Sequence, residues 1–242
     1  MPNPKTLPRV LLKLSGEALA DGHENPLCSK KLKYFAREIK AAIEMGVQVA
    51  VVVGAGNFLR GATTSNEVIS RTTADHMGML ATILNALALR DALEAIGQST
   101  RLYSAAIVPG VTETFDYRRA IENLENGAVT LMAGGTGNPF VTTDSAASLR
   151  AIELNVDLLL KATGVDGVYS SDPKLDPNAK KYSFISYNDV IKKELAVMDL
   201  AAFCQCRDYN IPIRVFDLNK KAALFNALLG QKEGTLVANK ES

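Results

Sequence analysis

A run of aliphatic residues at positions 47–53 (VQVAVVV) constrains the fold of this chain more than any other feature. Only Gln48 in this run is polar, so the run lacks the alternation typical of a strand with one face in water. An almost wholly apolar strand is typical of a parallel sheet whose two faces are both covered by helices. Gly46 precedes the run and Gly54 follows it, and glycine commonly ends helices and strands. The run therefore predicts an α/β fold.

Segments with helical spacing alternate with short apolar runs along the rest of the chain. This alternation predicts a mostly parallel sheet with helices on both faces. The length allows one large domain or two closely joined lobes. We expect strands at 10–14, 47–53, 101–108, 129–132, 156–162, 211–216 and 234–238, and helices at 30–45, 72–96, 117–125, 146–154, 197–203 and 220–229.

Composition and charge exclude several classes of protein. The 242 residues are 47% hydrophobic and 22% charged, with a net charge of +1, so bulk charge indicates no nucleic-acid or membrane partner. The first residues lack the apolar core of a secretory signal, and no apolar run approaches the roughly 20 residues that span a bilayer. Three cysteines without such a signal predict reduced thiols and a cytoplasmic location. Cys204 and Cys206 have no histidine near them in sequence, so we expect no metal site there.

The segment 133–148 (AGGTGNPFVTTDSAAS) carries the densest set of candidate ligand-binding residues. It joins the strand expected at 129–132 to the helix expected at 146–154, and ligands of open α/β sheets bind at such strand ends. Its glycines let the backbone approach a ligand, and its threonines and Asn138 add hydroxyl and amide groups. Asp144 stands where a helix N-cap is expected. An ordinary turn capped by Asp144 is the alternative, but it accounts for only part of this set.

Lysines occur in two of the expected buried strands. Lys13 interrupts the apolar run 10–14, and a lysine there is costly unless its ammonium group leaves the strand end or meets an anion. Ser15 and Gly16 follow, and their backbone N–H groups can bind phosphate, although no Walker A loop is present. Lys161 likewise lies at the end of its strand. A lysine that snorkels from an edge strand is the alternative.

The strand at 47–53 leads directly into a glycine-containing turn, 54–61 (GAGNFLRG). A strand followed by Gly-x-Gly is typical of a dinucleotide site, but Leu59 stands where the third glycine would be. A dehydrogenase is therefore the weakest interpretation. A glycine turn that ends in Arg60 suits a phosphate, because backbone N–H groups and a guanidinium fork both bind its oxygens.

The charged candidates fit the transfer of a phosphoryl group between two anionic ligands. We find no convincing Ser/His/Asp or Cys/His set and no metal-ligand spacing. An acceptor phosphate, whose second pKa is about 6, is already a nucleophile at neutral pH and needs no general base. It needs cations and Mg²⁺ to cancel its repulsion from the γ-phosphate of ATP. The residues alone therefore indicate a phosphate-handling α/β protein and leave its substrate open. The acidic candidates are Asp75, Asp144, Asp172 and Asp199.

Several collinear blocks together resemble the bacterial uridylate kinases of the amino acid kinase family. The blocks are LLKLSGEAL (11–19), GAGNFLRG (54–61), DHMGMLAT (75–82), AGGTGNPFVTTDSAA (133–147), LLKATGVDGVYSSDP (159–173), VMDLAAF (197–203) and IPIRVF (211–216). The resemblance implies a single αβα-sandwich domain over 1–242 and a homohexamer. It implies transfer of the ATP γ-phosphate to UMP, giving UDP for pyrimidine nucleotide biosynthesis, with inhibition by UTP and commonly activation by GTP.

The resemblance also implies roles for individual residues. The N-terminal part mainly holds UMP and the C-terminal part mainly ATP, with Mg²⁺ carried by the ATP phosphates rather than by direct protein ligands. The implied catalytic residues are Lys13, Arg60 and Asp144. The implied ATP-binding residues are Lys13, Leu14, Ser15, Gly16, Gly56, Arg60, Thr163, Tyr169 and Asp172. The implied UMP-binding residues are Ala55, Asp75, Thr136, Gly137, Asn138, Pro139, Phe140, Val141, Thr142 and Thr143.

Two departures from the family pattern bear on these expectations. Ala55 stands where relatives commonly have the middle of three glycines, and backbone binding of phosphate is expected to survive the added methyl group. The loop 21–29 (DGHENPLCS) replaces a glycine-rich run in a region associated with GTP activation. The alternatives are a related carboxylate or carbamate kinase and a non-catalytic nucleotide- or oxyanion-binding protein on the same fold.

Overall fold

A computed structural model describes residues 8–22, 24–59, 61–173, 175–195, 197–229 and 231–240, with no description of the side chains of Gly61 and Ala62. Arg60, a predicted site residue, therefore lies outside the described part. The strands are β1 (Arg9–Leu14), β2 (Gln48–Val53), β3 (Thr100–Ser104), β4 (Glu113–Thr114), β5 (Val129–Ala133), β6 (Leu158–Thr163), β7 (Phe184–Ser186), β8 (Ile213–Asp217) and β9 (Thr235–Ala238). The helices are η1 (Gly16–Leu19), α1 (Ser29–Glu44), α2 (Gly61–Thr64), α3 (Arg71–Glu94), α4 (Tyr117–Glu125), α5 (Thr143–Glu153), α6 (Tyr187–Lys192), α7 (Leu200–Asp208) and α8 (Ala223–Leu228).

Within the described residues, the strands form one nine-stranded sheet in the order β4-β3-β5-β2-β1-β6-β8-β9-β7. Every pairing is parallel except that of β8 with β9. The central strands β1 and β2 are buried along almost their whole length, as their apolar sequences predict. The mostly parallel sheet is confirmed.

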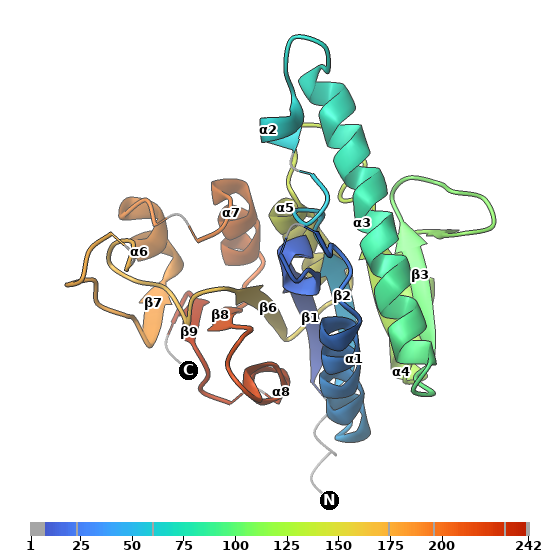
Figure 1. Ribbon diagram of the computed structural model, residues 1–242. Coiled ribbons are helices and arrows are strands. Elements are labelled where there is room, and N and C mark those ends of the chain that lie inside the picture. The colour runs from blue at the N-terminus through green and yellow to red at the C-terminus, as the bar shows by residue number, and fades with distance from the viewer. Residues whose placement is uncertain are drawn as a thin grey trace, which may run out of the picture.

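Helices cover both faces of the sheet, so the predicted αβα sandwich is also confirmed. Alternate strand residues such as Leu12 and Val51 pack with α1, α3 and α8 on one face. The intervening residues such as Leu11 and Val52 pack with α4, α5, α6 and α7 on the other. Figure 1 shows α1 and α3 in front of the sheet. Lys13 shares its face with Leu11, and that face is the one covered by α5.

The chain order around β1 determines where a ligand can bind. β2 lies on one side of β1 and β6 on the other, so connections leave the carboxyl edge in opposite directions at this point. Ligands of open α/β sheets bind in the crevice at such a switch point. In Figure 1, α2 and the first turns of α3 extend beyond this edge. No helix in the described ranges is long and apolar enough to cross a membrane.

Some element boundaries differ from the sequence-based expectations. The strand expected at 101–108 ends at Ser104, because the Ala106 N–H turns back to the Ser104 hydroxyl at 3.1 Å. The helix expected at 197–203 begins only at Leu200, with Asp199 as its N-cap. Asp199 was expected on a buried helix, yet it is only partly buried and Leu200 is 59% exposed. These boundaries depend on tertiary contacts, which the spacing of apolar residues along the sequence does not predict.

The N-cap expected at Asp144 is a wrong prediction with a clear cause. Helix α5 begins at Thr143, and Thr142 is its N-cap, whose hydroxyl accepts the Asp144 N–H at 3.2 Å. Threonine can satisfy a free N–H group at a helix start as aspartate does. The Asp144 carboxylate is thereby left within the first turn, available for other contacts.

Candidate active site

Two buried lysines and one buried aspartate form the centre of the site. Lys13 of β1 and Lys161 of β6 are register partners on adjacent parallel strands, so their side chains leave the same face of the sheet. Asp144, in the first turn of α5, lies between them. The Lys13 Nζ is 2.8 Å from its Oδ1, and the Lys161 Nζ donates to its Oδ2. At 7–9% exposure, these three residues form a charge cluster that is largely removed from water.

The charges of this cluster perturb one another. Burial raises the pKa of Asp144, but the ammonium groups of Lys13 and Lys161 outweigh burial and hold that pKa below its ordinary value. Burial lowers the pKa of Lys161, and the Lys13 charge lowers it further, against the attraction of Asp144. With both lysines protonated, the cluster carries a net positive charge. It therefore favours an anion at the carboxyl edge of the sheet.

Two backbone loops meet beside the cluster, and glycine is required where they touch. A Cβ on Gly16 would lie 2.2 Å from the Asn57 Oδ1 and 2.7 Å from the Gly56 nitrogen.

Ala55 is not among the residues with a positive φ, so its methyl group carries no left-handed strain. The loop after β2 therefore accommodates alanine where the family commonly has glycine.

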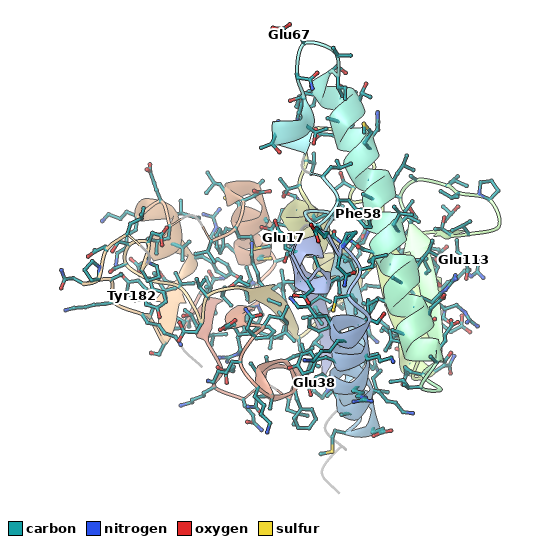
Figure 2. The ribbon with its side chains drawn as sticks, in the orientation of Figure 1. Glu17, Glu38, Phe58, Glu67, Glu113 and Tyr182 are labelled. Carbon is teal, nitrogen blue, oxygen red and sulfur yellow. The ribbon has the colours of Figure 1, made fainter. Side chains whose placement is uncertain are left out.

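Asn85 of α3 fixes the loop after β2. Its buried amide donates to the Gly54 carbonyl at 2.7 Å and exchanges two 2.8 Å hydrogen bonds with the Asn57 amide. Asn57 also donates to the Pro26 carbonyl at 2.7 Å. Figure 2 places Glu17 and Phe58 together at this end of the sheet, well away from Glu38 on α1. A buried side-chain network of this kind holds the backbone N–H groups of the loop in one arrangement.

The opposite wall of the site joins the start of α3 to the loop after β5. The Asp75 Oδ2 accepts the Phe140 N–H at 2.8 Å, and the Arg71 Nε lies 3.0 Å from the Asp75 Oδ1. Burial raises the pKa of Asp75, but the Phe140 N–H and Arg71 together bring it below its ordinary value. Gly134, with φ +75°, donates its N–H to the Thr82 hydroxyl at 2.7 Å. The loop is thus fastened to α3 at both of its ends.

These walls enclose an open cleft of about 360 Å³. The predicted site residues that line it are Lys13, Ser15, Gly16, Ala55, Gly56, Asp75, Val141, Thr142, Thr143 and Asp144. They come from both the predicted ATP set and the predicted UMP set. The structure therefore brings together residues from distant parts of the sequence at one edge of the sheet.

Other predicted site residues do not line this cleft. Leu14 is buried in the core. The others are Thr136, Gly137, Asn138, Pro139 and Phe140 of the loop after β5, Thr163 at the end of β6, and Tyr169 and Asp172 after it. Thr163 ends β6, and its hydroxyl donates to the Val165 carbonyl at 2.7 Å. The Tyr169 hydroxyl donates to Asp166 at 2.5 Å. Their roles stay predictions.

Sequence reasoning did not assign several residues that the structure places in the charge cluster or at the cleft. Lys161 was noted as a cation at a strand end, and its register with Lys13 and its contact with Asp144 make it a member of the cluster. Arg71 was missed, although a positive residue four positions before Asp75 is a recognisable helix pair. Asp199 lines the cleft and accepts a hydrogen bond from the Thr142 hydroxyl. The signal for Glu17, which also lines the cleft, was too weak to single it out.

The carboxylates of the cleft bear on the expected Mg²⁺. Among the described residues, no three His, Cys, Asp or Glu side chains are grouped closely enough to hold a metal ion together. Both oxygens of Asp144 already contact lysines. Such a cleft fits a cation that keeps most of its ligands from water and substrate phosphates, as Mg²⁺ does.

Comparison with known proteins identifies the family. The amino acid kinase family matches residues 8–217. The uridylate kinase of Coxiella burnetii is 55% identical, covering 95% of this chain and 94% of its own, and that of Alcanivorax borkumensis is 54% identical over 95% and 91%. The crystal structure of a UMP kinase from Bacillus anthracis superposes with a TM-score of 0.93 at 40% identity, covering 98% of both chains. An aspartate kinase from Synechocystis, at 18% identity and a TM-score of 0.69, shares the fold.

The chain belongs to the amino acid kinase family and, within it, to the uridylate kinases.

Proposed function

We propose that this enzyme transfers the γ-phosphate of ATP to UMP, giving UDP and ADP. The observation that carries the proposal is the Lys13–Asp144–Lys161 cluster at the switch point of the sheet, facing a cleft whose far wall is the loop held by Asp75. The names of the relatives, uridylate kinase and UMP kinase, support UMP as the acceptor.

The reaction needs little covalent chemistry from the protein. An oxygen of the UMP phosphate attacks the γ-phosphorus, a new P–O bond forms, and the bond to the ADP oxygen breaks. The UMP phosphate, whose second pKa is about 6, is ionised at neutral pH and supplies the electron pair without a base. The protein must hold two anions together and stabilise the charge on the transferring group.

Lys13 and Lys161 provide that stabilisation in this proposal. Their ammonium groups lie at the edge where the two nucleotides would meet, and Asp144 holds both in place. Asp144 thereby orients the cations rather than accepting a proton, which its lowered pKa also favours. Mg²⁺, when bound with ATP, would neutralise part of the phosphate charge. We assign the phosphate oxygens to backbone N–H groups of the loops after β1 and β2, which line the same cleft as Lys13.

The individual binding roles remain as the resemblance implies. We assign the start of α3 and the segment 136–143 to UMP, with Ala55. We assign the loop after β1, Gly56 and the segment after β6 to ATP, with Thr163, Tyr169 and Asp172 on the adenosine. We propose that Arg60, which is not among the described residues, contacts phosphate. We propose a single domain, in which the residues assigned to UMP lie between 55 and 143 and those assigned to ATP lie at 13–60 and 163–172.

Assembly, control and location are proposals as well. We propose a homohexamer, inhibition by UTP, activation by GTP subject to the altered loop 21–29, and a cytoplasmic location. Self-association is supported by apolar side chains exposed on α3, where Leu80 is 54% and Leu84 is 50% exposed. Light scattering and assays with added UTP or GTP test the assembly and the control.

The experiment that tests the function measures ADP release from MgATP with one acceptor at a time. UMP, dUMP, CMP, AMP, aspartate and acetylglutamate are offered in turn, and the phosphorylated product is identified. The proposal predicts turnover with UMP far above that with any other acceptor. Turnover with aspartate or acetylglutamate would instead indicate a carboxylate kinase. Tight nucleotide binding without turnover would indicate a non-catalytic binding protein.

A further inference from the structure

Arg71 contacts both groups that hold the loop after β5. Its Nε lies 3.0 Å from each oxygen of Asp75, and its guanidinium carbon lies 5.5 Å from the centre of the Phe140 ring. Asp75 in turn accepts the N–H of the same Phe140 at 2.8 Å. One arginine at the start of α3 is therefore in contact with the side chain of a distant loop residue and with the acceptor of its backbone N–H.

The contact differs from an ordinary surface pair on a helix. Arg71 and Asp75 are four residues apart, a spacing that commonly gives a weak, solvated ion pair. Here the Asp75 side chain is only 12% exposed and holds a residue 65 positions further along the chain. Both Arg71 and Asp75 also line the cleft. The pair therefore forms part of the wall that the acceptor would meet.

Phe140 needs such support. It has φ +66°, a conformation that residues other than glycine rarely adopt, and its side chain is exposed although it is large and apolar. Strained backbone of this kind persists where its surroundings hold it, and it is concentrated at ligand sites. The hydrogen bond from the Phe140 N–H and the guanidinium over its ring are the contacts that hold this residue.

We propose that Arg71 is a positioning residue of the acceptor site. It fixes the Asp75 carboxylate so that Oδ2 faces the Phe140 N–H, and it rests against the Phe140 ring. In this way it determines how the segment 136–142 closes over the acceptor nucleotide. The inference rests on the proposed function for the identity of that acceptor, UMP. Arg71 acts through Asp75 and Phe140 and is not placed on the transferring group.

The first test compares Arg71→Gln and Arg71→Lys with the unmodified enzyme. Loss of the guanidinium frees the loop before UMP binds, so KM for UMP is expected to rise by about tenfold, with a change of less than about threefold in kcat and in KM for ATP. Arg71→Lys keeps the charge but lacks the planar fork, so it should restore only part of the loss. Arg118→Gln is the matched control, because Arg118 also lies 5.5 Å from a ring centre but is exposed and outside the cleft.

The second test does not depend on activity. Amide hydrogen exchange of the segment 136–142 is measured without nucleotide, where the Phe140 N–H is expected to exchange faster in Arg71→Gln than in the unmodified enzyme. Phe140→Leu removes the ring contact but keeps the N–H, so it should give a smaller increase. This variant also keeps the test open if Arg71→Gln fails to fold.

The outcomes separate this inference from the proposed function. An unchanged KM for UMP together with unchanged exchange would overturn the role of Arg71 even if UMP is the substrate. Equal losses in kcat for every acceptor, with KM for UMP unchanged, would overturn it too, because Arg71 would then act on transfer itself. Absence of UMP turnover in the unmodified enzyme would refute the proposed function, and the exchange measurement would then decide the role of Arg71 alone.

Discussion

Lys13 and Lys161 are register partners on two adjacent parallel strands, and their ammonium groups contact opposite oxygens of one carboxylate, that of Asp144. This relationship turns two separately costly buried lysines into one organised cation pair. The pairing of β1 with β6 sets the lysines side by side, and the first turn of α5 supplies the charge that holds them.

Removal of Lys161 should impair transfer more than nucleotide binding. Lys161→Met keeps much of the side-chain volume but removes one of the two cations, so kcat is expected to fall by about 10²–10³-fold, as when a single electrostatic stabiliser is lost. Steady-state kinetics with UMP checks this. Lys40→Met is the control, because Lys40 pairs with Glu44 on α1 outside the cleft and its loss should change kcat little. A small effect of Lys161→Met on kcat would show that Lys13 alone stabilises the transferring group.

Gly16 should not tolerate a methyl group. In Gly16→Ala the new Cβ would meet the Asn57 side chain at 2.2 Å and the Gly56 backbone nitrogen at 2.7 Å, so the two loops proposed to bind phosphate must separate. KM for ATP is expected to rise by about tenfold or more, because the misplaced N–H groups no longer fit the phosphates. Gly127→Ala is the control for a glycine replacement far from the cleft, since its added Cβ, at φ +77°, meets no atom within 4 Å. Equal kinetics of the two variants would contradict the close approach of the loops.

Asn85 should stabilise the fold as well as the site. Asn85→Ala removes the donor to the buried Gly54 carbonyl and to the Asn57 side-chain oxygen, at a cost of about 1–3 kcal/mol for each unsatisfied group. Urea unfolding should therefore show a lower free energy of unfolding than in the unmodified protein. Asn219→Ala, at an exposed turn position, should change it by less than about 0.5 kcal/mol. An unchanged free energy of unfolding in Asn85→Ala would mean that water replaces the hydrogen bonds of the Asn85 amide.

The charge of Asp144 should make the free energy of unfolding depend on pH. Its pKa is lower in the folded protein than the ordinary 3.8, so the unfolded chain takes up a proton first as the pH falls. The stabilisation from the charged carboxylate is fully present above pH 3.8 and is lost as the pH falls through the folded pKa. Unfolding curves of the unmodified protein and Asp144→Asn, recorded from pH 6 downward, should converge below pH 3.8. A difference in stability that is independent of pH would show that Asp144 is not held charged.

The sequence predicts most of the scaffold because local pattern and burial agree there. The apolar run at 47–53 is β2, the helix expected at 117–125 is α4, and the mostly parallel sheet is observed. Lys13 was also recognised as a site candidate, because a lysine in a buried strand is costly. The glycine loops were recognised because glycine lets the backbone approach a ligand. Local pattern is therefore enough to find the edge of the sheet at which the cleft and the charge cluster lie.

The finer arrangement of the site depends on contacts between distant segments. The register of β1 with β6 decides that Lys161 joins Lys13, and no local pattern encodes that register. The start of α5 at Thr143, with Thr142 as its N-cap, leaves the Asp144 carboxylate in the first turn, where it contacts both lysines. Likewise, Arg71 is recognised as a residue of the site only from the contacts that join the loop after β5 to α3.

A single-turnover measurement on Asp144→Asn tests whether this carboxylate holds the two lysines for transfer. Phosphoryl transfer from MgATP to UMP is followed by rapid quench, and the Kd for UMP is measured by calorimetry on the same preparation. With Asp208→Asn as an exposed control, the account predicts a transfer rate lower by about 10²–10⁴-fold and a Kd for UMP within about threefold of the unmodified enzyme. An equal loss in the transfer rate and in UMP affinity would contradict the role of Asp144 in holding the two lysines for transfer.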